Sequence, residues 1–258
     1  MFSKLRSLIF KVDPEKAHTL AIKSLKFNLV PNVFDENKND PIFQTKIFNK
    51  DLDNPIGIAA GFDKNAEVYN SLFKLGFGFV EVGTITPLKQ YGNPKPRVFR
   101  LVEDEALINR LGFNNQGAEI VKERIKCNKK LGLLGINVGP NKDSSDRLND
   151  YLIGLKTFYD DADYITINIS SPNTENLRTF HEGDKLQDLL KSIMEERKNL
   201  KSNIPIAVKV SPDISEDQVN QISEILLEHE IKAIIVSNTS EATRDKLSNI
   251  QRHQKGGL

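Results

Sequence analysis

The chain is poor in the residues that build covalent or metal-held frameworks. Its only cysteine is Cys127, and its four histidines are far apart in the sequence. A single cysteine excludes internal disulfides and a cysteine zinc cluster, and it suits a reducing compartment. Histidines without close spacing give no metal-ligand pattern, so we expect no metal site.

Long apolar runs and a strong charge imbalance are also absent. No apolar run approaches the ~18 residues of a membrane-spanning helix, and no small-residue cleavage site follows an apolar core near the start. The 36 basic and 35 acidic residues leave a net charge of +1, so we expect no nucleic-acid partner. At 258 residues with 38% hydrophobic residues, the chain can form one large α/β domain or two small ones.

The first thirty residues are basic and amphipathic. They contain six basic and two acidic residues, a local net charge of +4. Apolar residues at helical spacing predict a helix from Met1 to about Lys11, and Asp13 followed by Pro14 is typical of the start of a second helix. Such helices bind anionic membrane surfaces. A helical hairpin packed on the main domain gives the same pattern, so both interpretations stay open here.

After a predicted linker at Pro31–Pro41, strands and helices alternate. Alternation of this kind predicts right-handed crossovers and a parallel sheet. The predicted strands are six short apolar runs, at Pro55–Gly61, Phe79–Thr86, Leu134–Gly139, Tyr164–Ser170, Ile206–Ser211 and Ala233–Thr239. Helical segments include Asn65–Leu75, Gln116–Lys130, Lys185–Leu200 and Glu216–His229, the last with Ser215 as its cap, and two extra hairpins are expected at Phe43–Leu52 and within Arg97–Asn109. We place the domain boundary between residues 38 and 39.

Each predicted strand ends in polar or small residues. The fourth run passes directly into Asn-Ile-Ser-Ser-Pro-Asn-Thr at residues 168–174, and the fifth contains Lys209 between two valines. In α/β barrels, ligands bind at the carboxyl ends of the strands. A lysine in an apolar strand is costly to bury unless a partner or an anionic ligand meets it. Each strand exit alone is also explained by an ordinary turn, but six similar exits favour a shared ligand site.

Five motifs together resemble one enzyme family. They are Ala-Ala-Gly-Phe-Asp-Lys at 59–64, Glu-Val-Gly-Thr-Ile-Thr-Pro at 81–87, Asn-Arg-Leu-Gly-Phe-Asn-Asn at 109–115, the 168–174 exit, and Val-Lys-Val-Ser-Pro-Asp at 208–213. In order and approximate spacing they resemble dihydroorotate dehydrogenase, in its membrane-associated, quinone-dependent class. Ser171 stands at the catalytic-base position, where the soluble class has cysteine, and the basic N-terminal helices are also typical of the quinone class.

The resemblance implies a TIM (β/α)8-type barrel with an N-terminal helical extension that serves as membrane and quinone segment (residues 1–38). It implies oxidation of dihydroorotate to orotate in pyrimidine biosynthesis, with FMN as cofactor and ubiquinone as acceptor. By this resemblance FMN would contact Ala60, Gly61, Phe62, Asp63, Lys64, Thr84, Asn137, Asn168, Lys209 and Ser237. The substrate would contact Lys64, Asn109, Arg110, Leu111, Gly112, Phe113, Asn173, Asn238 and Thr239.

The resemblance also assigns roles at both ends of the reaction. Ser171 would remove the proton next to the substrate carbonyl, and because a hydroxyl is a poor base, a neighbour or a water chain must carry the proton onward. The loop at 109–115 would close over the ligand, with Phe113 keeping water out. His18 and Arg100 are candidates for the quinone end, although His18 as an ordinary helix-surface residue is an equally simple interpretation. The resemblance further implies a monomer on the membrane surface, at the cytoplasmic face of the inner membrane in a bacterium.

The sequence departs from the family pattern in three places. Pro140 stands where lysine is common, and Ser237 where threonine is usual. More seriously, only six of the eight expected strands are found, and the two missing units would hold the FMN phosphate. We therefore expect residues 1–258 alone to bind FMN poorly and to aggregate. A non-catalytic remnant, a split protein completed by another chain, and a related flavin barrel with another acceptor are the alternatives.

Overall fold

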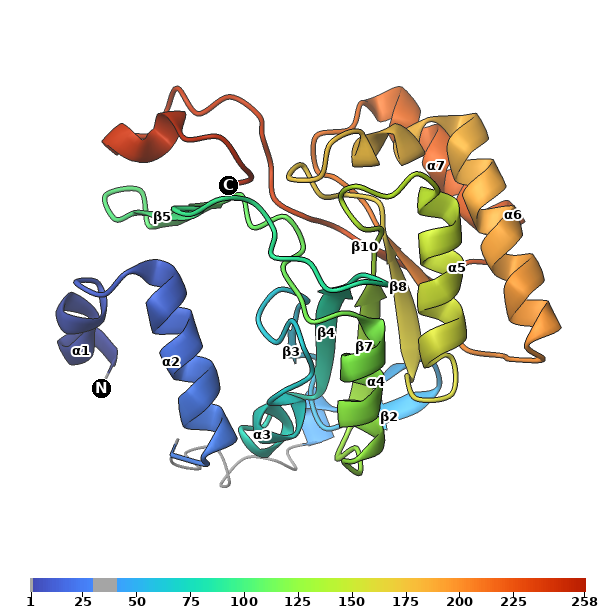
Figure 1. Cartoon of the computed structure of the whole chain (residues 1–258), viewed down its shortest axis with the longest axis horizontal. Helices are drawn as coiled ribbons and strands as arrows, with labels where there is room; N and C mark the ends of the chain where they lie inside the picture. The colour runs from blue at the N-terminus through green and yellow to red at the C-terminus, as the bar shows by residue number, and fades with distance from the viewer. Residues whose placement is uncertain (1, 30–40) are drawn as a thin grey trace.

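The structure is a computed structural model and describes residues 2–29 and 41–258 (Figure 1). The predicted domain boundary after residue 38, and the predicted linker except for Pro41, lie outside the described residues. A short 3-10 helix, η2 (Pro41–Phe43), opens the second described range. The main domain that follows is built around one curled parallel sheet.

The sheet confirms the six predicted strands. It consists of β3 (Gly57–Ile58), β4 (Phe79–Ile85), β7 (Leu133–Val138), β8 (Tyr164–Asn168), β9 (Ile206–Lys209) and β10 (Ala233–Ile235). Neighbours in the sheet follow chain order, and every pair is parallel. All the strands therefore point the same way, and their polar exits come together at one edge of the sheet.

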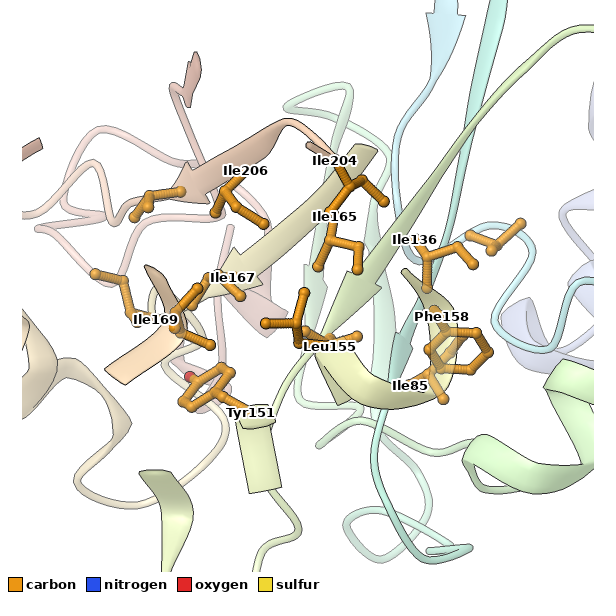
Figure 2. Close-up of a cluster of buried hydrophobic side chains, with 14 of the residues drawn as sticks. Ile85, Ile136, Tyr151, Leu155, Phe158, Ile165, Ile167, Ile169, Ile204 and Ile206 are labelled. Atoms are coloured by element: carbon orange, nitrogen blue, oxygen red, sulfur yellow. The ribbon is translucent and has the colours of Figure 1, made fainter. Parts of the chain in front are cut away.

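Helices cover the outer face of the sheet and bury its main core. They are α3 (Tyr69–Lys74), α4 (Ala118–Lys126), α5 (Arg147–Phe158), α6 (Gly183–Asn199) and α7 (Glu216–Glu228). Ser215 caps α7 as predicted, in a capping box with Gln218. Figure 2 shows β-branched side chains of the strands, such as Ile165 and Ile167, packed against Leu155 and Phe158 of α5. All four of these residues are fully buried.

The other face of each strand lines the inside of the curled sheet. Successive side chains of a strand point to opposite faces, so Ile136 faces the helices while Gly135 and Asn137 face inward. Only glycine fits at position 135, because a Cβ there would be 2.1 Å from the Tyr164 ring. At the amino ends of the strands the lining is apolar and includes Phe48 of the first hairpin.

Both predicted hairpins are present. β1 (Thr45–Ile47) pairs with β2 (Lys50–Leu52) near the amino ends of the sheet strands, and β5 (Val98–Leu101) pairs with β6 (Ala106–Asn109) near their carboxyl ends. A segment at 240–258, which contains η4 (Ile250–His253), lies across the second hairpin (Figure 1). Asn109 exchanges backbone hydrogen bonds of 2.9 and 2.8 Å with Gly257, so this segment fixes the end of β6.

The N-terminal residues form two helices, α1 (Phe2–Ile9) and α2 (Pro14–Lys26). The predicted cap is confirmed, because the Asp13 side chain accepts a hydrogen bond from the Lys16 N–H at 2.9 Å. Figure 1 shows α2 beside α3 and the β5–β6 hairpin, and Leu25 is buried there. Leu20 of the same helix is 56% exposed, and Leu8 of α1 is 66% exposed.

The two helices therefore pack on the main domain and also present apolar side chains to solvent. An ion pair fixes this docking: Arg97 donates to both carboxylate oxygens of Glu15, at 2.6 and 3.1 Å. Within the described ranges, no helix has the length and apolar character needed to cross a membrane.

Candidate active site

The strand exits enclose a cleft of about 400 Å³. Fifteen of the residues singled out from the sequence line it: Ala60, Gly61, Lys64, Thr84, Asn109, Leu111, Gly112, Phe113, Asn168, Ser171, Asn173, Lys209, Ser237, Asn238 and Thr239. They come from all parts of the barrel and from the loop after β6, so the fold brings together motifs that are up to 179 residues apart in the sequence. Gly83, Val98, Leu107, Asn114 and Leu258 complete the wall.

Lys209 lies in the floor of this cleft and is 7% exposed. Burial lowers the pKa of its amine, and the carboxylate of Glu81 opposes that shift. An amine that is buried but has a counter-charge keeps its proton more readily than an isolated one. The floor of the cleft can therefore present positive charge to a ligand.

Glu81 is the centre of a hydrogen-bond network under the cleft. Its Oε1 accepts from Asn137 Nδ2 at 2.9 Å, and its Oε2 accepts from the hydroxyls of Tyr164 at 2.9 Å and Thr166 at 2.8 Å. Because a carboxylate only accepts, the Asn137 amide must turn its NH₂ group toward Glu81. Its oxygen then faces the opposite way, toward Asn168.

The network continues upward from Asn137 to the cleft. Asn137 Oδ1 accepts from Thr84 Oγ1 at 2.6 Å and from Asn168 Nδ2 at 3.1 Å. Asn168 Oδ1 accepts from the Ser170 hydroxyl at 2.8 Å, and the Ser170 oxygen accepts from Asn238 Nδ2 at 3.0 Å. Each hydrogen bond thus determines which way the next amide group is turned. This series of hydrogen bonds ends at Asn238, a residue of the cleft wall.

The substrate end of the cleft carries amides and hydroxyls in close contact. Asn173 Nδ2 donates to Asn109 Oδ1 at 3.4 Å, and Asn238 Oδ1 accepts from the Thr239 N–H at 2.8 Å. Ser171 is 4% exposed, and its Oγ accepts from the Asn173 N–H at 3.2 Å. The remaining hydrogen-bonding capacity of these groups is available to a ligand with its own donors and acceptors.

Lys64 stands between this cleft and a second one. Its amine donates to the Gly61 carbonyl. Burial lowers the pKa of Lys64 to about 8, while the charges of Glu15 and Asp63 oppose the shift and that of Arg97 adds to it. Near neutral pH the amine is therefore mostly charged, and it becomes neutral within a mildly alkaline range.

Four of the residues predicted to contact FMN or the substrate lie outside the main cleft. Arg110 points away from it, with its guanidinium on the Phe99 ring at 4.6 Å and a 2.9 Å hydrogen bond to the Pro96 carbonyl. Asn137 is fully buried below the cleft floor. Phe62 and Asp63 line the second cleft instead.

Asp63 serves mainly to hold its own loop. It is 1% exposed and accepts backbone N–H bonds from Val68 at 2.7 Å and Glu67 at 2.8 Å. Burial raises the pKa of this carboxyl, and the backbone donors oppose that shift. The Asp63 side chain thus fixes the turn that presents Lys64.

The second cleft, of about 420 Å³, lies between α2, the 61–67 loop and the β5–β6 hairpin. Both quinone candidates line it. The His18 ring contacts the Phe62 ring edge-on at 5.4 Å, and its Nε2 lies 2.8 Å from the Phe62 carbonyl. Burial and the nearby charge of Lys64 lower the pKa of His18. Arg100 is partly engaged, since it donates to the Val12 carbonyl at 2.7 Å.

The two clefts share part of one wall, formed by Gly61, Lys64, Val98, Leu107, Leu111 and Asn114. Asn114 belongs to the 109–115 motif but had no predicted contact of its own. Its Oδ1 is buried and has no hydrogen-bond partner among the described residues. The two clefts are therefore neighbours that a shared wall separates.

The cleft residues fit a flavin. Gly61 has a φ of +112°, and a Cβ placed there would meet no atom within 4 Å, so it would occupy the cleft where a flat ring can lie on the backbone. Lys209, Asn168 and Ser237 supply donors and acceptors along the floor. The cleft volume also falls within the usual range for a cofactor site. In the described parts of the chain no group of metal-ligating side chains is found.

A curled parallel sheet with outer helices and a polar cleft at the strand ends defines a (β/α)-barrel enzyme. The family model for dihydroorotate dehydrogenase matches residues 42–258. A dihydroorotate dehydrogenase (quinone) from Agrobacterium fabrum is 45% identical over all of this chain and 72% of its own length, and one from Bartonella tribocorum is 47% identical over 98% of this chain and 71% of its own. The chain therefore belongs to the dihydroorotate dehydrogenase family, in its quinone class.

Solved structures agree with this assignment. The chain resembles the crystal structure of DHODH from Eimeria tenella in complex with ferulenol, with a TM-score of 0.90 and 35% identity over 95% of this chain and 72% of that one. The ligand-free structure from the same organism gives a TM-score of 0.89. The predicted TIM-type barrel is thus confirmed, and the structure describes six of its strands.

Proposed function

We propose that the two clefts together oxidise dihydroorotate to orotate and pass the electrons to a quinone. One observation carries this proposal: a buried serine, a lysine and four amide or hydroxyl side chains face one cleft, and a second cleft shares its wall. As a member of the family, the chain is an oxidoreductase of pyrimidine biosynthesis. A non-catalytic remnant is not favoured, and a barrel with another acceptor is not supported, since the relatives are quinone enzymes.

FMN is the proposed cofactor of the main cleft. The family consists of flavoenzymes, and we infer that Gly61, Thr84, Asn168, Lys209 and Ser237 hold the flavin. When bound, the flavin accepts a hydride from the substrate and passes electrons on. Lys209 faces it with positive charge, which stabilises the negative charge that reduction adds.

The substrate binds on the amide side of the cleft in this proposal. Lys64 meets the orotate carboxylate, and Asn109, Asn173, Asn238 and Thr239 meet the amide groups of its ring. A site built from paired amides rejects analogues that leave those amides unsatisfied. Leu111, Gly112 and Phe113 close the cleft from above and exclude water, while Arg110 holds its own loop from behind.

Ser171 takes the proton from the substrate carbon. Its oxygen already accepts one hydrogen bond from the Asn173 N–H, and its own proton is free to pass to a water in the cleft. His181 is not that acceptor, because its two ring nitrogens bond the Arg178 carbonyl and the Ser211 N–H. The reaction therefore needs a water next to Ser171 as the outlet for the proton.

The second cleft is the proposed quinone site, with His18 and Arg100 at its wall. The exposed apolar residues of the N-terminal helices, Leu8, Leu20 and Phe27, support docking on a membrane surface, together with the local positive charge. A quinone could then enter from the lipid side. Monomeric association with the cytoplasmic face of a bacterial inner membrane is part of this proposal.

Flavin absorbance and quinone reduction test the proposal. The protein as its gene encodes it, purified in detergent with FMN, should show flavin absorbance and reduce a ubiquinone analogue when dihydroorotate is added. Flavin reduction without quinone reduction would overturn the role of the second cleft, and a flavin that dihydroorotate does not reduce would overturn the proposal. That residues 1–258 alone bind FMN weakly stays a prediction.

The affinity for orotate should fall above about pH 8, where the Lys64 amine loses its proton. Only the charged amine attracts the carboxylate, so the dissociation constant is expected to rise toward tenfold per pH unit above that value. Titrations of the flavin absorbance with orotate between pH 6 and 9.5 measure this. Lys64→Arg is the control, because arginine stays charged over this range. Any pH dependence of the dissociation constant that remains in this variant belongs to the ligand itself. Equal slopes for both proteins would exclude the Lys64 contact.

A further inference from the structure

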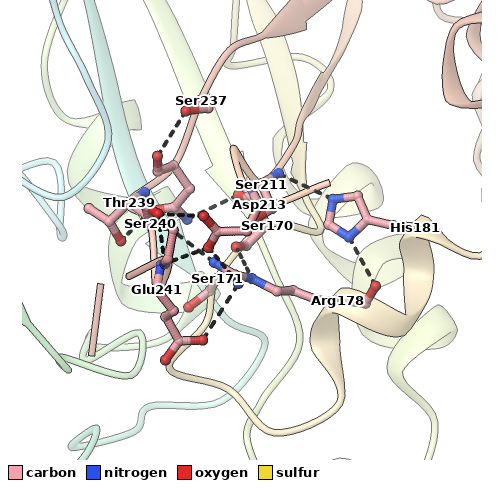
Figure 3. Close-up of polar contacts among 12 residues, drawn as sticks. Ser170, Ser171, Arg178, His181, Ser211, Asp213, Ser237, Thr239, Ser240 and Glu241 are labelled. Atoms are coloured by element: carbon pink, nitrogen blue, oxygen red, sulfur yellow. Dashed lines mark hydrogen bonds and ion pairs between the residues drawn. The ribbon is translucent and has the colours of Figure 1, made fainter. Parts of the chain in front are cut away.

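One arginine joins the exits of three neighbouring strands (Figure 3). Arg178 lies in the short 3-10 helix η3 (Leu177–His181), which follows the loop after β8. Its Nε donates to the Ser170 carbonyl at 3.1 Å, its Nη1 to Asp213 Oδ2 at 3.0 Å after β9, and its Nη2 to the Thr239 carbonyl at 3.2 Å after β10. Nη1 also donates to Glu241 Oε2 at 3.5 Å, so four acceptors surround one planar group.

Asp213 extends the connection to the exit of β10. Its Oδ2 also accepts from the Glu241 N–H at 2.7 Å, and its Oδ1 accepts from the Ser240 hydroxyl. These donors and Arg178 outweigh the effect of burial and lower the pKa of the carboxyl. Asp213 is thus charged at neutral pH, and it holds the backbone that follows Thr239.

His181 forms a second connection between the same helix and β9. The Ser211 N–H donates to its Nε2 at 3.2 Å, so its Nδ1 carries the proton and donates to the Arg178 carbonyl at 2.9 Å. His181 is 2% exposed, and burial lowers its pKa, which keeps the ring in this neutral form. Arg178 is therefore held both through its guanidinium and through its backbone carbonyl.

The groups joined by Arg178 lie next to the residues that face the cleft. Ser170 precedes Ser171, and Asn238 and Thr239 also line the cleft, with Asn238 Nδ2 donating to the Ser170 hydroxyl at 3.0 Å. Arg178 itself does not line the cleft. We propose that Arg178 is a positioning residue, which fixes the distance between the Ser171 loop and the Asn238–Thr239 pair. This inference rests on the proposed function, since it concerns how that site is kept in its reactive arrangement.

The arrangement demands arginine rather than any cation. Four acceptors around one plane match a guanidinium, whereas the lysine ammonium is a single point charge. Without the guanidinium, the loop that carries Ser171 can move relative to the Asn238–Thr239 pair. A displacement of about 1 Å in a reacting group can cost on the order of 10²-fold in rate. Because all the amides remain, substrate binding should suffer less than proton removal.

Arg178→Ala and Arg178→Lys, measured in the FMN-loaded protein, test the inference. We expect a fall in kcat on the order of 10²-fold for alanine and 10-fold for lysine, with KM changed less than about threefold. Deuterium at the carbon that loses its proton should give a larger isotope effect than in the parent protein, since a misplaced Ser171 makes proton removal slower. A structural role alone would lower the amount of folded protein and leave the isotope effect unchanged.

Hydrogen exchange supplies a readout without turnover. In both variants, backbone amides at 170–176 and 238–241 should exchange at least about tenfold faster, while those of α6 stay unchanged. Faster exchange on one side only, or an unchanged isotope effect, would overturn the inference. Lys185→Ala is the matched control: it removes a 2.8 Å ion pair to Glu182 on the nearby surface and should change neither measurement.

Two further results keep the inference separate from its premise. If Arg178→Ala does not fold, Asp213→Asn tests the inference in its place, because it keeps the shape of the side chain. Hydrogen exchange at 170–176 and 238–241 should then become faster by a smaller factor. If Ser171→Ala left flavin reduction fast, the base assignment would fail. Coupled loosening of the two segments would then still show that Arg178 joins them.

Discussion

Ser171→Ala is expected to slow the reduction of the flavin by dihydroorotate by about 10²- to 10⁴-fold, the usual contribution of a positioned general base. Ser171 is 4% exposed, so solvent does not readily replace its hydroxyl. The amides that bind the ring lie on other residues, Asn109, Asn173 and Asn238, and they are unchanged by the substitution. Orotate affinity should therefore stay within about threefold, and stopped-flow absorbance with orotate titration measures both quantities.

A second substitution at the same position separates chemistry from packing. Ser171→Cys replaces the hydroxyl by a thiol of similar size that can ionise, with an ordinary pKa near 8.5. It should retain more activity than Ser171→Ala, and its rate should rise with pH as the thiolate forms. Ser192→Ala on α6, which removes a hydroxyl that bonds only to the Asp188 carbonyl, is the control for a lost hydroxyl. Fast flavin reduction in Ser171→Ala would show that another group takes the proton.

The sheet could be predicted from the sequence because its signal is local. Each strand is a short apolar run that ends in polar residues. The predicted run Tyr164–Ser170 extends two residues beyond the strand, which ends at Asn168, and Ala233–Thr239 extends four beyond Ile235. The hairpins, the Asp13 cap and the Ser215 cap are also local patterns, and all are confirmed. Local patterns do not determine which side of α2 packs against the main domain. Leu20 is exposed because His18 and Ile22 occupy the inner face, next to the second cleft.

The cleft walls were predictable for the same reason, but the layer beneath them was missed. Glu81, Tyr164 and Thr166 had been treated as parts of motifs or of apolar runs. A signal was present: within strands that are otherwise apolar, Glu81, Asn137, Thr166, Asn168 and Lys209 occupy alternate positions. Period-two alternation places such residues on one face of a sheet. Contacts such as those of Arg178 had no comparable signal, because they join side chains and carbonyls that meet only in the folded chain.

Glu81→Ala should destabilise the protein by about 3–5 kcal/mol, because it removes both the charge that opposes the burial of Lys209 and the acceptor of three buried hydrogen bonds. Glu81 is 3% exposed, and its loss would leave the Lys209 amine with no counter-charge in the floor of the cleft. It would also leave the donors of Asn137, Tyr164 and Thr166 without their acceptor. Denaturant unfolding followed by fluorescence or circular dichroism measures the change, with Glu81→Gln as the matched variant that keeps the shape and loses the charge.

The pH dependence should identify Lys209 as the cause. Its pKa is lowered in the folded protein already, and it falls further when Glu81 no longer opposes the effect of burial. Between the folded value and the ordinary value near 10.4, the unfolded chain binds more protons, so stability rises with pH. The deficit of Glu81→Ala should thus shrink as the pH is raised. It should also shrink in Glu81→Gln/Lys209→Met, where no buried charge is left unpaired. A deficit that is independent of pH and unrelieved in the double variant would mean that Glu81 acts through its hydrogen bonds alone.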